Sequence, residues 1–161
     1  MTDPRIIAIT LDGGSILRRS PAVEREREVA VSDLLAANRF APSRDEACGH
    51  GGPWAVTLRV MDGRLAIDLA IATTEAPLRT VLVPLARFKR PIRDYFAIVD
   101  SHLQALGAGT PHGLEAIDMA RRGIHNDAAT LLQECLAPKI AVDFDTARRL
   151  FTLLCVLHIR A

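Results

Sequence analysis

A dense group of cations is the most conspicuous chemical feature of the chain. Four of them fall within seven consecutive residues that contain no acidic side chain: Arg87, Lys89, Arg90 and Arg93. Pro91 predicts a helix start in this segment, and the helix dipole makes cations unfavourable at that end. A bound anion would relieve the repulsion and accept hydrogen bonds from the free N–H groups of the first turn. The group therefore predicts a site for an anionic small molecule or an acidic protein surface. Ion pairing with Glu24, Glu26 or Glu28, or a solvated loop, is the structural alternative.

Ionisable side chains gather again farther along the chain. Glu115, Asp118 and Arg122 share one face of a predicted helix, and Asp118 with Arg122 has the favourable i,i+4 order. His125 follows Gly123, where the pattern predicts a turn, and a histidine near a carboxylate is the minimum for general acid–base catalysis. His125 with Asp118 or Glu115 thus predicts a small hydrolase or phosphoryl-handling enzyme as the alternative function. Structural ion pairing and helix capping explain the same residues without catalysis.

The leading hypothesis is a non-catalytic binding or regulatory protein. No nucleophile stands at a fixed spacing from His125, and the sequence contains no HExxH motif. The basic residues of 87–93 are therefore expected to recognise an anionic ligand or an acidic partner, with Arg121 and Arg122 as second choices. A subunit of a larger assembly, docked through the same basic residues, is a third possibility.

Neither a metal nor a cofactor is predicted. Cys48 and His50 lie in one loop with Asp45 and Glu46 nearby, but two soft ligands without a second such pair are weak evidence for zinc. The chain has three cysteines and no CxxC motif, which indicates free thiols in a reducing, cytoplasmic setting. No amino-terminal signal pattern is present, and the most apolar stretch, 150–159, is far shorter than the ~20 residues of a membrane span.

Length and charge exclude several other classes of protein. With 161 residues, of which 49% are hydrophobic and 24% charged, the chain is predicted to form a single globular domain over residues 1–161. The net charge of +1 and the aromatic content of 4% argue against nucleic acid as a partner. The near-neutral total conceals one positive segment, because residues 1–86 carry −1, residues 87–93 carry +4 and residues 94–161 carry −2.

Among the elements that must position these groups, a hairpin has the clearest local sequence signal. Asp62-Gly63 predicts a two-residue turn, which places Val60 opposite Leu65. The same register gives three more apolar pairs on one face: Leu58–Ile67, Val56–Leu69 and Trp54–Ile71. An alternating run predicts a first strand over 5–11, and Pro84 suits an edge position in a strand over 79–85.

Helices dominate the rest of the chain. Apolar periodicity predicts them from Pro21 to about Asn38, from Pro91 to Gly107, from Pro111 to Gly123, and from Asn126 or Asp127 to before Pro138. Residues 41–53 are predicted as a loop and 139–144 as a short strand. Asp145 is predicted to cap a last helix that is apolar nearly all round over 150–157 and is therefore central or at a homodimer interface. The predicted class is α+β, a small antiparallel sheet of about four strands with four to five helices packed on it.

Several long motifs resemble a small group of bacterial proteins. They read FKRPIRDYF at 88–96, EAIDMARRGIHN at 115–126 and VDFDTARRLFTLLCVLH at 142–158, with shorter motifs ERER at 24–27 and FAP at 40–42. On these motifs the chain resembles uncharacterised protein family 0262 over nearly its whole length. Residues 43–51 match no pattern of the group, which weakens any role for Cys48 or His50. The resemblance implies a cytoplasmic bacterial protein, and it implies neither an activity nor catalytic residues.

Overall fold

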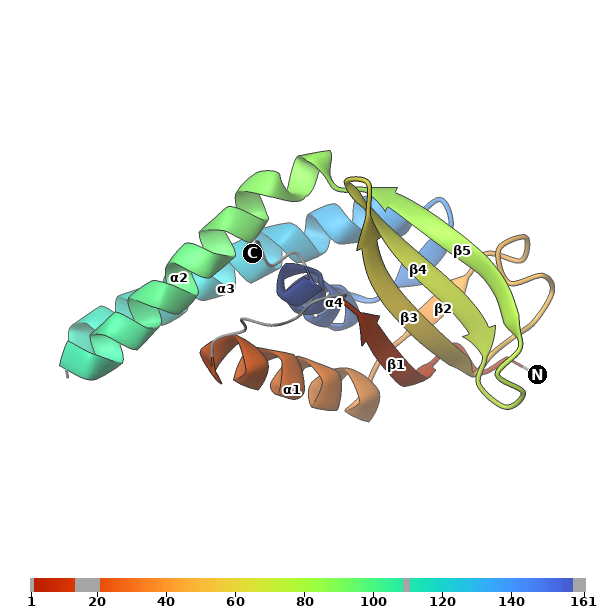
Figure 1. Ribbon diagram of the computed structural model, residues 1–161, viewed down its shortest axis with the longest axis horizontal. Helices are drawn as coiled ribbons and strands as arrows, with labels where there is room; N and C mark the ends of the chain where they lie inside the picture. Colours follow the sequence, from red (N-terminus) through yellow and green to blue (C-terminus); the bar gives the residue numbers. More distant parts are fainter. Residues whose placement is uncertain (1, 14–20, 109–110, 158–161) are drawn as a thin grey trace.

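The computed structural model describes residues 2–13, 21–108 and 111–157, and it confirms the α+β class (Figure 1). The strands are β1 (Ile6–Asp12), β2 (Phe40–Pro42), β3 (Trp54–Met61), β4 (Arg64–Ile71), β5 (Pro77–Pro84) and β6 (Ile140–Val142). The helices are α1 (Pro21–Ala36), α2 (Lys89–Ala108), α3 (Pro111–Leu136) and α4 (Phe144–Leu157), and a 3₁₀ turn, η1 (Ala86–Phe88), leads into α2. None of the described helices is long and apolar enough to cross a membrane.

Strands β3 and β4 form the predicted hairpin. Asp62 and Gly63 have φ angles of 51° and 72°, the positive values that a two-residue hairpin turn requires. Val60 pairs with Leu65, and the register continues as predicted to Trp54 opposite Ile71. Seven of the eight residues in these pairs lie in the core or pack against it, which confirms this part of the prediction, and Ile71 at the end of the register is partly buried.

One strand pair differs from the predicted antiparallel sheet. The four-stranded sheet has the order β1-β3-β4-β5, in which β1 runs parallel to β3 and the other two pairs are antiparallel. The segment between β1 and β3 contains α1. Such a helical crossover returns the chain to the end of the sheet at which β1 began, so that β3 runs in the same direction as β1. The sheet is therefore mixed. Strand β5 lies at the opposite edge, where Pro84 was expected.

Residues 41–53 are not entirely a loop. Phe40–Pro42 forms β2, which pairs antiparallel with β6 in a separate two-stranded sheet. Phe40 is fully buried at the start of this strand and lies opposite Val142. Three residues are too few to show a periodicity, so the short strand depends on a partner far along the chain and not on its own pattern.

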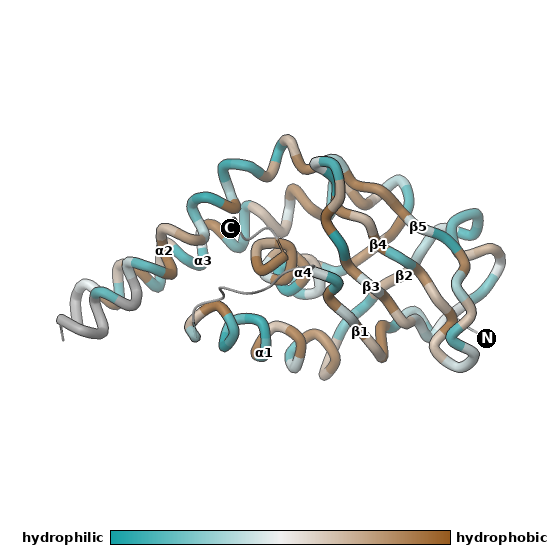
Figure 2. Tube along the Cα trace, viewed as in Figure 1, coloured by the Kyte–Doolittle hydropathy of each residue, from teal (hydrophilic) through white to brown (hydrophobic). Residues whose placement is uncertain are grey.

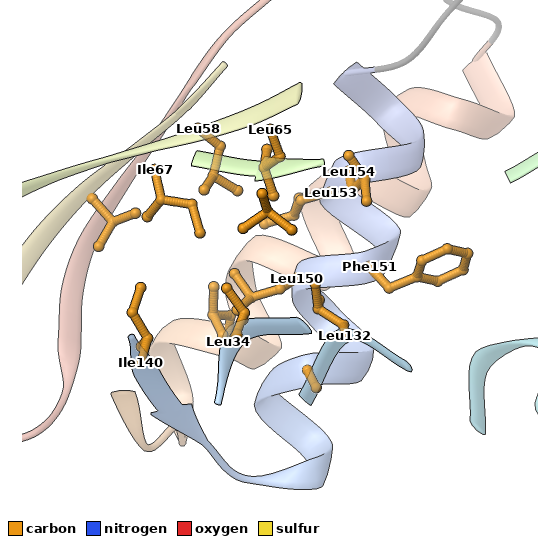
Figure 3. Close-up of a cluster of buried hydrophobic side chains, with 14 of the residues drawn as sticks. Leu34, Leu58, Leu65, Ile67, Leu132, Ile140, Leu150, Phe151, Leu153 and Leu154 are labelled. Atoms are coloured by element: carbon orange, nitrogen blue, oxygen red, sulfur yellow. The ribbon is translucent and has the colours of Figure 1, made fainter. Parts of the chain in front are cut away.

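Helix α4 lies at the centre of the molecule, between the sheet, α1 and α3 (Figures 1 and 2). Its residues from Leu150 to Val156 are all at most 6% exposed. The close-up shows α4 side chains facing apolar residues of α1, α3 and the sheet, among them Leu34, Leu132, Leu58, Leu65 and Ile67 (Figure 3). The apolar circumference of α4 is thus covered within one chain. The helix is central, and the homodimer prediction loses the observation on which it depended.

The cap of α4 is one acidic residue earlier than predicted. The backbone N–H of Thr146 donates to Oδ1 of Asp143 at 3.0 Å, and the helix begins at Phe144. Asp143 is therefore the N-cap, and Asp145 lies in the first turn, where its charge favours the positive end of the dipole. Two carboxylates spaced by one residue offer equivalent caps in the sequence, and the choice between them depends on where the core places the helix.

Helix α3 continues without interruption through Gly123, so the predicted helix end at this residue is wrong. Glycine costs about 1 kcal/mol in a helix interior relative to alanine. Ala128, Ala129 and Leu132 follow it on a face that is buried in the core, and this packing outweighs the local penalty. His125 consequently lies within a helix and not in a turn. Helices α2 and α3 together form a hairpin that extends away from the sheet (Figure 1).

Asn38, just after α1, ties that helix to the edge of the sheet. Its Oδ1 accepts from the backbone N–H of Ile6 at 2.7 Å, and its Nδ2 donates to the carbonyl oxygen of Ile6 at 2.9 Å. Nδ2 also lies 2.8 Å from the carbonyl oxygen of Leu34, so the same amide satisfies the end of α1. One side chain therefore fixes how α1 meets β1.

Candidate functional site

A cleft of about 400 Å³ lies between α1, α3 and α4. Small-molecule sites in proteins typically measure ~300–1,000 Å³. Helix α1 lines the cleft with Glu26, Val29, Ala30 and Asp33, α3 with Asp118, Arg121, Arg122 and His125, and α4 with Arg148, Arg149 and Thr152. In each helix these positions follow the i, i+3, i+4 spacing, so each set is a stripe along one side of its helix.

Positive charge predominates slightly in the cleft. Four arginines and three carboxylates line it, a formal charge of +1 when His125 is neutral. The guanidinium of Arg121 donates to the carboxylate of Glu26 and so compensates that charge. Across the described part of the chain, Arg122, Arg148 and Arg149 form no ion pair with any carboxylate. The arginines without an ion pair thus lie on the α3 and α4 sides of the cleft, and the excess of positive charge lies on α4.

His125 is almost fully buried, with 6% of its surface exposed. Its Nδ1 lies 3.4 Å from Oγ1 of Thr152, and the rings of Tyr95 and Phe151 pack edge-to-face against it with centroids 5.6 and 5.7 Å away. Burial in this apolar surrounding, reinforced by the charges of Arg121 and Arg148, lowers the pKa of His125 to about 4. The imidazole is therefore neutral at pH 7.

Three buried polar atoms around His125 lack hydrogen-bond partners among the described residues. They are Nε2 of His125, Nε of Arg148 and the hydroxyl of Tyr95. Burial also raises the pKa of Tyr95 well above its ordinary value, so the hydroxyl keeps its proton. Most buried polar groups in proteins are hydrogen-bonded, and a group that is not is typical of a place where a water molecule or a ligand supplies the bond.

The structure brings together some of the predicted site residues. Asp118, Arg121, Arg122 and His125 all line the cleft, whereas Glu115 is exposed on α3 and does not line it. Nδ1 of His125 is hydrogen-bonded to Thr152, and no described carboxylate is hydrogen-bonded to either ring nitrogen. The residues proposed for acid–base catalysis thus share a cleft, but their side chains are not hydrogen-bonded to one another.

The cations of 87–93 lie elsewhere, around η1 and the start of α2, and none of them lines the cleft. Helix α2 begins at Lys89, two residues before the predicted Pro91. Arg87 lies 3.7 Å from Glu134 and Arg90 lies 4.0 Å from Asp94, so the predicted ion pairing occurs, although with other acids than those of α1. The side chains of Arg87 and Arg90 are 65% and 83% exposed, and such pairs contribute little.

Arg148 and Arg149 are cleft residues that the sequence interpretation missed. It assigned this segment to helix capping. A usable signal was present, because two adjacent cations interrupt a helix whose remaining residues are mostly apolar. In an otherwise apolar helix, such a pair indicates that one side of the helix is kept polar.

Comparison with known protein families identifies relatives of the chain. The model of the uncharacterised protein family UPF0262 matches residues 3–160. The chain belongs to this family. A UPF0262 protein of Sphingopyxis alaskensis is 55% identical over 156 residues, 97% of this chain and 94% of the relative. A UPF0262 protein of Erythrobacter litoralis is 53% identical over 160 residues, 99% of both chains. No solved structure matches the chain. Membership of UPF0262 confirms the resemblance seen in the motifs and assigns no reaction.

Proposed function

We propose that this UPF0262 protein is a non-catalytic binding or regulatory protein that holds an anionic ligand in the cleft between α1, α3 and α4. The observation that carries the proposal is the convergence of Arg122, Arg148 and Arg149 on one cleft, without an ion pair to any described carboxylate. Guanidinium groups held near one another repel, and an anion between them removes that cost. Their planar arrangement of N–H donors matches the oxygens of carboxylate and phosphate groups.

The form of the site favours a small molecule over an acidic protein surface. A concave cleft formed by three helices surrounds a ligand on several sides, and it strengthens electrostatic interactions by excluding part of the water. The cations around the start of α2 are exposed, and Arg87 and Arg90 already have acidic neighbours. The proposal therefore assigns the ligand to Arg122, one of the two second-choice residues, together with Arg148 and Arg149 of α4, whereas Arg121 is already paired with Glu26.

Thermal unfolding with inorganic phosphate and with succinate, at constant ionic strength, tests this assignment. The cleft variant is Arg122→Gln/Arg149→Gln, and the matched control is Arg90→Gln/Arg93→Gln, which removes the same charge outside the cleft. A ligand at a hundred times its Kd stabilises by about 2.7 kcal/mol, or about 5–10 °C in Tm for a chain of this size. We expect this rise in the wild type and the control and its loss in the cleft variant. No rise in the wild type, or a rise lost only in the control, overturns the proposal.

A further inference from the structure

We infer that the anion bound in the cleft also carries a hydroxyl group, and that this hydroxyl donates a hydrogen bond to Nε2 of His125. The inference rests on the proposed function and specifies the chemistry of its ligand. The class it names is a carboxylate or phosphate ester with a neighbouring hydroxyl, as in a hydroxy acid or a sugar phosphate.

Thr152 determines which ring nitrogen of His125 carries the proton. Oγ1 of Thr152 lies 3.3 Å from the carbonyl oxygen of Arg148, which can only accept, so the hydroxyl hydrogen is used there. The same oxygen lies 3.4 Å from Nδ1 of His125 and, with its hydrogen engaged, accepts a bond from that nitrogen. Both bonds form together only when Nδ1 is protonated. A neutral imidazole has one N–H group, so Nε2 has a free lone pair.

The charged groups around the ring keep it in this neutral form. Arg121 of α3 and Arg148 of α4 both disfavour a second positive charge, and burial acts in the same direction. The carboxylate of Glu26 on α1 is engaged by Arg121. The hydroxyl of the neighbouring Tyr95 does not reach Nε2, because both atoms lack a partner. Nε2 is therefore a buried acceptor without a donor among the described residues.

A ligand of the cleft meets two opposite requirements. Nε of Arg148 is a donor without an acceptor, and the guanidinium groups of Arg122 and Arg149 also present donors. Nε2 of His125 needs a donor. A simple anion satisfies the arginines and leaves Nε2 unsatisfied, whereas an anion with a neighbouring hydroxyl satisfies both. In this structure Nε2 is buried, so a ligand in the cleft reaches it only when neighbouring side chains rotate, a change that is common on binding.

Matched pairs of probes measure the hydroxyl preference. Malate is compared with succinate, and glycerol 3-phosphate with propyl phosphate, by calorimetric titration at pH 7 and fixed ionic strength. We expect the wild type to bind the hydroxylated member of each pair about tenfold more tightly. His125→Phe keeps a ring against Tyr95 and Phe151 but has no acceptor, and we expect it to bind both members with the weaker affinity. Thr152→Val leaves His125 in place but removes the hydroxyl that fixes the tautomer, and we expect it to reduce the preference.

The tautomer itself is measured on the unliganded wild type by ¹⁵N NMR of the imidazole, with a protonated Nδ1 and an unprotonated Nε2 expected at pH 7. A protonated Nε2 overturns the inference, whatever the probes do. Equal binding of both members of each pair by the wild type also overturns it, while the proposed function stands. If none of the four probes binds, the proposed function falls and the inference falls with it.

Discussion

The guanidinium of Arg121 donates to the carboxylate of Glu26, and this contact joins the middle of α3 to α1 in the cleft that both residues line. The Glu26 side chain is only 16% exposed, so the pair is largely removed from solvent on that side. The contact decides how much of the positive charge of the cleft is available to a ligand, because it neutralises one of four arginines.

Replacing Glu26 with glutamine is expected to destabilise the fold and to strengthen anion binding. Arg121 loses the charge of its partner, and a hydrogen bond to a charged group contributes about 1.5–3 kcal/mol. The formal charge of the cleft rises from +1 to +2, so phosphate binds more tightly. Urea unfolding and phosphate titration measure the two effects. Glu134→Gln is the control, since it removes an exposed partner of Arg87 and is expected to change stability by at most about 0.5 kcal/mol. Equal effects of the two substitutions would contradict the role given to Glu26.

Stability is expected to fall as the pH is lowered from about 6.5 to about 4. In the unfolded chain a histidine binds its proton near the ordinary pKa of 6.5, whereas burial lowers the pKa of folded His125 to about 4. Between these values the unfolded state binds more protons, so acid favours unfolding by up to about 3 kcal/mol at the lower end. The measurement is the free energy of unfolding of the wild type and of His125→Phe across this range. As the pH falls, the free energy of unfolding should decrease more for the wild type than for His125→Phe. A difference between the two proteins that stays constant with pH would show that His125 is not buried in its neutral form.

Asp143→Ala is expected to destabilise α4 more than Asp145→Ala. The first substitution removes the acceptor of the Thr146 N–H group, which costs about 1 kcal/mol at a typical N-cap. The second removes a favourable charge in the first turn, worth about 0.3–1 kcal/mol at low salt. Chemical unfolding at low and high salt separates the two, because only the Asp145 effect should be screened strongly. The reverse order of effects would restore the cap predicted from the sequence.

Gly123→Ala is expected to stabilise the protein by about 0.5–1 kcal/mol. An added Cβ at this position meets no atom within 4 Å, and alanine is the better helix former. Gly63→Ala serves as the contrast, because the open space there is the same but φ is +72°. The left-handed conformation costs an alanine about 1–2 kcal/mol. If Gly123→Ala destabilised the protein as Gly63→Ala does, α3 would end where the sequence suggested.

The hairpin was predictable because its information is local. Asp62-Gly63 and the alternating residues on either side specify the turn, the register and the buried face together, and no distant segment is needed. The direction of β1, in contrast, was not predictable from the local sequence. Its pattern is the same for a parallel and an antiparallel neighbour, and only the helical crossover decides between them.

The cleft was predictable only in part, since it is assembled from three helices that are far apart in the sequence. His125 and Arg122 were found because ionisable residues cluster locally around them. Arg148 and Arg149 have a plausible local explanation as part of a capped helix. Only the packing of α4 between α1 and α3 places them in the same cleft as His125 and Arg122. The misplaced end of α3 had the same origin, because the local preference of Gly123 is weaker than the burial of the residues that follow it.

The double hydrogen bond between the Asn38 amide and the backbone of Ile6 has a consequence for solubility. The amide presents one donor and one acceptor to the outward side of β1, as a residue of a neighbouring strand would. At that residue the edge of the sheet cannot begin a ladder with another molecule. At the opposite edge, β5 begins at Pro77 and ends at Pro84, which have no N–H group to offer. The Asn38 amide at Ile6 and the prolines at both ends of β5 thus limit the positions at which a strand of another molecule can pair with the sheet edges.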